Sequence, residues 1–175
     1  FLLILTLFLS ILTIKIFYYN SINLYTLISY ISLVIIFSLL AFLAYYDFIK
    51  MEVHSNISFV LMIVLVLLNI LLYSLKGDIQ VINGWVYSPY QNILSILFLG
   101  TLFQFTVLVS KEKALGQGDV RIAIITGSLI GFGNIIYWSY ITIFSALVYG
   151  VYIAYKKKRF RGLRIPFVPF MVLGT

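Results

Sequence analysis

The stretch from Leu24 to Tyr46 reads LYTLISYISLVIIFSLLAFLAYY and contains no charged residue. A helix of this length is about 35 Å long, which is enough to cross the hydrocarbon core of a bilayer, about 30 Å thick. Across all 175 residues, 63% are hydrophobic and 10% are charged. Soluble domains average about 45–50% apolar and about 25% charged residues. The sequence therefore predicts a membrane protein rather than a soluble domain.

Similar apolar blocks recur along the chain, separated by joints that contain charge, Gly, Pro or Asn. They predict an all-α, polytopic membrane protein with about six spanning helices plus the start of a seventh. The predicted spans are Phe1–Phe17, Leu24–Tyr46, Ile57–Leu75, Asn92–Val109, Val120–Phe132 and Ile135–Tyr155, with the seventh beginning at Ile165. We expect one membrane-embedded domain over residues 1–175, truncated at both ends, because the chain begins with Phe and its last apolar stretch is too short to span.

The composition excludes several kinds of site. The chain has no Cys and a single His, so it offers neither disulfides nor the Cys and His clusters of zinc and haem sites. A net charge of +7 would suggest nucleic-acid binding in a soluble protein, but here membrane topology explains the positions of the charges better. We therefore expect no metal site and no nucleic-acid partner.

The basic residues gather in alternate joints, and Lys and Arg in short loops stay on the cytoplasmic side of a membrane. If Asp47 and Asp119 lie on that side, only Lys15 and Lys76 fall on the other. The cytoplasmic side then carries Lys50, Lys111, Lys113, Arg121, Lys156, Lys157, Lys158, Arg159, Arg161 and Arg164. The pattern predicts a multi-pass protein of the cell membrane with both aspartates near the cytoplasmic face.

The acidic residues need separate explanations, because a carboxylate at membrane depth costs about 2.5–3.5 kcal/mol. Asp78 and Glu112 lie in predicted joints and are interpreted as solvated loop charges. Asp47 lies at the cytoplasmic end of the Leu24–Tyr46 span. The simplest explanation of Asp47 is a helix-end carboxylate that pairs with Lys50, three residues later.

Asp119 closes the segment Gly116-Gln117-Gly118-Asp119, at the entrance to the predicted span Val120–Phe132. The two glycines permit unusual backbone angles and the close approach of a neighbouring helix or an extended peptide. The simplest explanation of Asp119 is an N-cap for the following helix, preceded by a flexible turn. Neither aspartate indicates chemistry when it is taken alone.

Taken together, Asp47 and Asp119 fall on the same predicted side of the membrane, although two spans and a loop separate them in sequence. Two neighbouring carboxylates do not ionise equally, so one keeps its proton while the other is charged, as an aspartyl protease requires. The pair titrates as a unit, so the sequence leaves open which aspartate is the acid. Glu52 is an alternative partner in place of Asp47.

Three motifs then resemble a known family. They are Asp47 followed six residues later by the aliphatic Val53, the segment Gly116–Val120 with the pattern G-x-G-D-V, and Ile165–Phe170 with the pattern I-P-F-x-P-F. This set resembles the type IV prepilin peptidases, also called leader peptidases or preflagellin peptidases, which are G-x-G-D membrane aspartyl proteases. The resemblance covers Leu24 to Thr175.

The resemblance implies a membrane aspartyl endopeptidase with Asp47 and Asp119 as the catalytic pair. Gly116 and Gly118 would shape the site. The substrate would be a prepilin, pseudopilin or preflagellin-like precursor of the type IV pilus class, cleaved after its short basic leader at the cytoplasmic membrane face. The implied reaction needs no cofactor for peptide cleavage, and the partners are the precursor and the lipid bilayer.

The sequence also departs from the family pattern and leaves alternatives open. Val53-His54-Ser55 stands where many relatives have Ile-Pro followed by Asn or Asp. Methylation by S-adenosylmethionine stays open, because the paired-cysteine segment of bacterial members does not occur in this sequence. A presenilin-like or signal-peptide-peptidase-like protease is one alternative, although its two aspartate motifs lie on adjacent spans. A proton-coupled carrier or an assembly scaffold is the alternative of another class.

Overall fold

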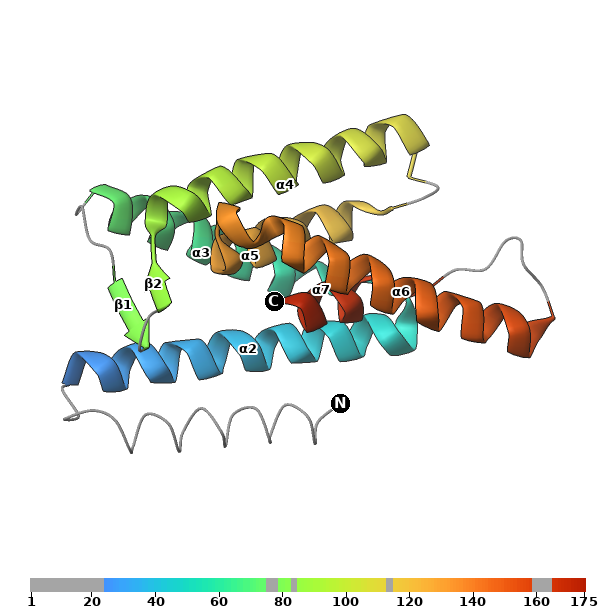
Figure 1. Cartoon of the computed structure of the whole chain (residues 1–175), viewed down its shortest axis with the longest axis horizontal. Coiled ribbons are helices and arrows are strands. Elements are labelled where there is room, and N and C mark those ends of the chain that lie inside the picture. The colour runs from blue at the N-terminus through green and yellow to red at the C-terminus, as the bar shows by residue number, and fades with distance from the viewer. Residues whose placement is uncertain (1–23, 75–78, 83–84, 113–114, 159–164) are drawn as a thin grey trace.

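The computed structural model describes residues 24–74, 79–82, 85–112, 115–158 and 165–175, and helices dominate these ranges. The helices are α2 (Leu24–Lys50), α3 (Ser55–Ser74), α4 (Pro89–Ser110), α5 (Gln117–Ile130), the short 3-10 helix η1 (Phe132–Asn134), α6 (Ile135–Lys157) and α7 (Val168–Gly174). They lie side by side as a bundle (Figure 1). The predicted helical class is confirmed.

Three helices within the described ranges are long and apolar enough to cross a membrane. They cover Ser32–Lys50, Pro89–Ser110 and Phe132–Lys157. The apolar stretch of α3, Ser55–Leu71, is shorter, and α5, with 14 residues, reaches only about 21 Å. The predicted span Phe1–Phe17 lies outside the described residues, so the total of six spans and the start of a seventh stays a prediction.

Large apolar side chains cover the outer surfaces of the long helices. Phe105 and Leu108 on α4 are 68% and 66% exposed, and Tyr140 and Phe144 on α6 are 72% and 70% exposed. In water such a surface would drive aggregation, whereas helices that are apolar on all sides are typical of membrane spans. Together with the three candidate spans, this surface identifies a membrane protein.

The short helix α5 lies at the centre of the bundle, where it packs against α3, α4, α6 and α7 (Figure 1). Most of its side chains are buried. Gly127 lets α4 come close, because a Cβ at Gly127 would lie 3.2 Å from the Ser95 carbonyl oxygen. Because α5 faces other helices rather than lipid, it need not be long enough to cross the bilayer.

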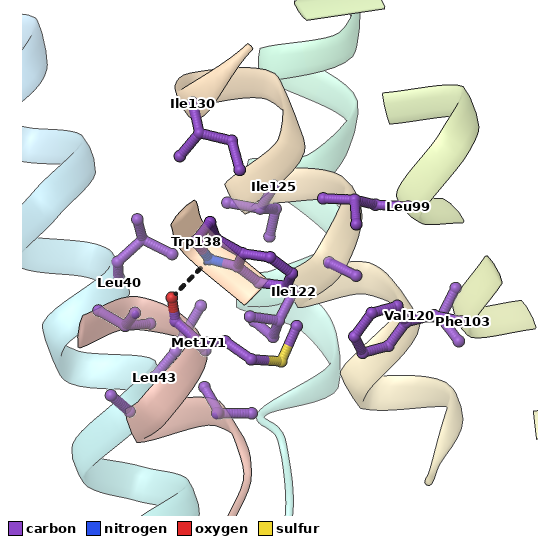
Figure 2. Close-up of a cluster of buried hydrophobic side chains, with 14 of the residues drawn as sticks. Leu40, Leu43, Leu99, Phe103, Val120, Ile122, Ile125, Ile130, Trp138 and Met171 are labelled. Carbon is purple, nitrogen blue, oxygen red and sulfur yellow. Dashed lines mark hydrogen bonds between the residues drawn. The ribbon is translucent and has the colours of Figure 1, made fainter. Parts of the chain in front are cut away.

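One apolar core joins the helices that carry the three motifs. Leu40 and Leu43 of α2 lie on one side of this core and Leu99 and Phe103 of α4 on the other, with Ile122 of α5 and Met171 of α7 between them (Figure 2). The indole Nε1–H of Trp138 on α6 donates a hydrogen bond to the Met171 carbonyl oxygen at 3.0 Å, drawn as the dashed line in Figure 2. The core therefore fixes α7 against α2 and α6.

The stretch between the predicted spans Ile57–Leu75 and Asn92–Val109 contains a short antiparallel hairpin, which the all-α prediction missed. Its strands are β1 (Ile79–Ile82) and β2 (Trp85–Tyr87), and Ile79 lies opposite Tyr87. The sequence signal for the hairpin is Asn83-Gly84, a pair typical of two-residue turns. The hairpin lies at the end of the bundle opposite the connection between α4 and α5 (Figure 1).

Candidate active site

A cavity of about 720 Å³ opens at the end of the bundle where α2 ends and α5 begins. Parts of all three sequence motifs line it: Asp47 and Val53, then Gly116, Gly118 and Asp119, then Ile165, Pro166 and Phe167. The α2–α3 loop and the α4–α5 loop supply the remaining walls. The fold thus brings together segments that are far apart in the sequence.

Asp47 lies in the last turn of α2, one turn after the core residue Leu43. Its side chain is only 5% exposed, and its Oδ2 accepts a hydrogen bond from the backbone N–H of Val168 at 3.1 Å. The Lys50 ammonium, the simple partner that sequence suggested, instead lies 4.9 Å from the centroid of the Tyr46 ring. Asp47 is therefore held by the start of α7 rather than by its own helix.

Asp119 is the third residue of α5, and Gly116 is the N-cap residue, so the expectation of an N-cap aspartate is wrong by three positions. The Asp119 Oδ2 accepts a hydrogen bond from the Gly116 backbone N–H at 2.9 Å. In a capping box, the side chain of the third helical residue accepts such a hydrogen bond from the backbone N–H of the N-cap residue. Burial raises the pKa of the Asp119 carboxyl above its ordinary value, and the Gly116 N–H opposes this with a smaller effect.

The two glycines of the G-x-G-D segment differ in what they contribute. A Cβ at Gly118 would lie 2.6 Å from both Cβ and Cγ2 of Val53, whereas a Cβ at Gly116 would meet nothing closer than 3.9 Å. Neither glycine has a positive φ, so neither uses the unusual backbone angles that glycine permits. Close approach is required at Gly118 alone.

The segment Ile165–Phe170 contributes both cavity-lining residues and a backbone hydrogen bond to the site. Ile165, Pro166 and Phe167 line the cavity, and Val168, the first residue of α7, donates the hydrogen bond to Asp47. The Val168 side chain itself is fully buried. The segment before α7 thus forms one wall of the cavity, and the first residue of α7 positions Asp47.

Further charged residues line the same cavity. Glu52 and Glu112 are exposed side chains in the α2–α3 and α4–α5 loops. Arg121 on α5 donates from Nη1 to the Ser55 Oγ at 2.8 Å and to the Ser55 carbonyl oxygen at 3.3 Å. Sequence reasoning treated Glu112 as a plain loop charge and Arg121 only as a topology determinant. Their predicted position on the same side as the two aspartates was the signal for a shared site.

Comparison with protein families gives one result. The model of the Type IV leader peptidase family matches residues 33–151, which is more than half of the chain. The chain belongs to this family. The match includes Asp47 and the G-x-G-D segment, whereas Ile165–Phe170 lies beyond its end. No curated protein matches the chain, and no solved structure matches it.

Membership of the leader peptidase family implies peptidase activity on prepilin-like precursors. The leader peptidase assignment agrees with the three helices that are long and apolar enough to cross a membrane. It also separates the chain from the presenilin-like alternative, which belongs to a different family.

Proposed function

We propose that this protein is a multi-spanning membrane aspartyl endopeptidase that removes the short basic leader from a prepilin, pseudopilin or preflagellin-like precursor. Asp47 and Asp119 are its catalytic pair. The observation that carries the proposal is that the two aspartates, from α2 and α5, line one cavity in a member of the leader peptidase family. Gly116 and Gly118 shape the loop that presents Asp119.

The reaction follows from two carboxylates that share one site. The charged carboxylate takes a proton from water, and the resulting nucleophile attacks the scissile carbonyl carbon. The protonated carboxyl polarises that carbonyl and then protonates the leaving amine. The raised pKa of Asp119 supports a site in which one carboxyl keeps its proton. Because the pair titrates as a unit, the two roles are not assigned to individual residues. The reaction needs no metal and no organic cofactor.

The charge of the cavity suits a basic leader. Four of the five acidic residues of the chain line the cavity: Asp47, Glu52, Glu112 and Asp119. Arg121, which also lines it, is turned toward Ser55 by two hydrogen bonds. A positively charged peptide segment is therefore attracted to the cavity, and a negatively charged one is repelled.

The cavity lies, in this proposal, at the cytoplasmic face. The same end of the bundle carries Lys50 in the last turn of α2, Lys111 at the end of α4 and Lys156–Lys158 at the end of α6 (Figure 1). Lys and Arg gather on the cytoplasmic side of membrane proteins. The proposed topology has about six membrane segments and the start of a seventh, of which α5 is a short segment enclosed by other helices, with the aspartates at the cytoplasmic ends of their helices.

The proposal is tested by co-expressing the protein in membranes with a pilin-like precursor and measuring removal of the leader. Asp47→Asn and Asp119→Asn should each abolish removal while inserting normally. Asp78→Asn is the matched control, because the sequence places Asp78 on the opposite side of the membrane, and it should cleave like the parent. Full cleavage by either active-site variant would remove that aspartate from the proposed pair.

A further inference from the structure

Val53 occupies the space that a side chain at Gly118 would need. A Cβ at Gly118 would lie 2.6 Å from Val53 Cβ, 2.6 Å from Cγ2 and 3.5 Å from Cγ1. Non-bonded carbon atoms normally stay about 3.5–4.0 Å apart. The α2–α3 loop and the start of α5 are therefore as close as these two residues allow.

The Val53–Gly118 contact joins the loop that follows Asp47 to the residue that precedes Asp119. The Met51 N–H donates to the Asp47 carbonyl oxygen at 2.8 Å and closes α2. Met51 has a φ of 54°, which is uncommon for a residue other than Gly and turns the chain sharply toward Val53. Gly118 immediately precedes Asp119. A second tie follows, in which Arg121 holds Ser55 at the start of α3.

We infer that the Val53–Gly118 contact sets the distance between the two aspartates, so that Val53 is a positioning residue for the cleavage reaction. The inference rests on the proposed function. Val53 touches the glycine rather than either carboxylate, and it acts through the placement of Asp119. A side chain at residue 118 would push the start of α5 away from the α2–α3 loop by about 1 Å, the amount needed to restore an ordinary contact.

The expected loss is in the chemical step. A displacement of about 1 Å at reacting groups costs on the order of 100-fold in rate. Gly118→Ala should therefore lower kcat by about 100-fold per folded molecule, with little change in KM, because the leader-binding residues Glu52 and Glu112 are untouched. Gly133→Ala is the matched control, since a Cβ at Gly133, which is remote from the cavity, would meet nothing closer than 3.8 Å.

Removing atoms from Val53 should restore activity in the Gly118→Ala background in a graded way. Val53→Ala removes Cγ1 and Cγ2 but keeps the Cβ contact of 2.6 Å, so its rescue should be partial. Val53→Gly removes all three contacts and should recover most of kcat. The single Val53→Gly variant loses the contact with Gly118 and has a more flexible loop, so it should itself lower kcat. A residue that only stabilises the fold would change the amount of folded enzyme and its Tm, but not the kcat of the folded fraction.

The experiment measures kcat, KM and Tm for the parent, Gly118→Ala, both double variants, Val53→Gly and Gly133→Ala, using a purified precursor in proteoliposomes. Graded recovery of kcat supports the inference. Parental kcat in Gly118→Ala, parental kcat in Val53→Gly, or no recovery of kcat in either double variant overturns it. A parent that cleaves no precursor overturns the proposed function, and with it the positioning role. The Tm values of the variants then show separately whether a side chain at residue 118 clashes with Val53.

Discussion

The carboxylate of Asp47 and the backbone N–H of Val168 are joined by a hydrogen bond of 3.1 Å across 121 positions of the chain. The bond connects the end of α2 to the first residue of α7. Because α7 is anchored by Trp138 and packs on α2, the aspartate is held by the tertiary fold. The orientation of this carboxylate therefore depends on elements that meet only in the folded bundle.

Replacing Val168 with Pro should remove this bond while keeping an apolar side chain. Pro is tolerated at the first position of a helix, which is where Val168 lies, but the αR angles of Phe167 are disfavoured before Pro, so Tm is measured beside kcat. A hydrogen bond to a charged group contributes about 1.5–3 kcal/mol, so kcat should fall by about tenfold or more. Val168→Ala is the control, because it keeps the N–H and leaves a cavity, and it should lower Tm more than kcat. The reverse order of effects would contradict the positioning role of the N–H.

The anchoring of α7 gives a second prediction, at Trp138. Trp138→Phe keeps an aromatic ring but removes the Nε1–H that bonds the Met171 carbonyl oxygen. The Met171 carbonyl oxygen still accepts a hydrogen bond from the Thr175 hydroxyl at 3.0 Å, so the expected loss is that of one hydrogen bond, about 0.5–1.5 kcal/mol of folding free energy. Leader removal should also slow, because α7 carries the Val168 N–H. Chemical denaturation and a cleavage assay measure the two effects, and Tyr140→Phe, at an exposed position of the same helix, should change neither.

The raised pKa of Asp119 gives a pH-dependent stability. Because the folded-state pKa exceeds the ordinary value of 3.8, this carboxyl stabilises the fold fully below that value, and the contribution is lost as pH rises through the folded-state pKa. Asp119→Asn cannot ionise. The Tm of Asp119→Asn relative to the parent should therefore rise as the pH increases from 3.8 through the folded-state pKa of Asp119. A difference in Tm that stays constant over this range would contradict the buried, proton-binding environment of Asp119.

The acidic residues at the rim of the cavity should act on substrate binding. Glu52→Gln and Glu112→Gln should each raise KM by a few-fold and leave kcat nearly unchanged, because exposed ion pairs contribute about 0.2–1 kcal/mol. The effect should shrink as salt increases. A precursor whose leader has its Lys and Arg residues replaced by Gln serves as the control. If the Glu variants impair that precursor equally, the two residues do not bind the leader.

Much of the helical framework could be predicted from runs of apolar residues. The span predicted at Leu24–Tyr46 is α2, Leu24–Lys50, and the one predicted at Ile135–Tyr155 is α6, Ile135–Lys157. The stretch Val120–Phe132 was harder to interpret, because an apolar segment in a membrane protein faces either lipid or other helices. Only the structure shows that α5 is a short helix within the bundle.

The meeting of Asp47 and Asp119 in one cavity was predictable from the sequence, but the details of the candidate site were not. The Val53–Gly118 contact and the Val168–Asp47 hydrogen bond join residues from distant parts of the chain. No local sequence pattern predicts contacts between residues so far apart in the chain. The sequence also could not show that close packing is required at Gly118 but not at Gly116, because this depends on what lies next to each glycine rather than on its backbone angles.

The central claim is that Asp47 and Asp119 act as one catalytic unit, and it is tested most directly by single-turnover leader cleavage with both single Asn variants and the double variant. Residues that act as a unit are strongly non-additive, so removing both should cost no more than removing either one. The account predicts that all three variants fall to the same residual rate. Losses that multiply in the double variant, or a single variant that cleaves at the parental rate, would contradict it.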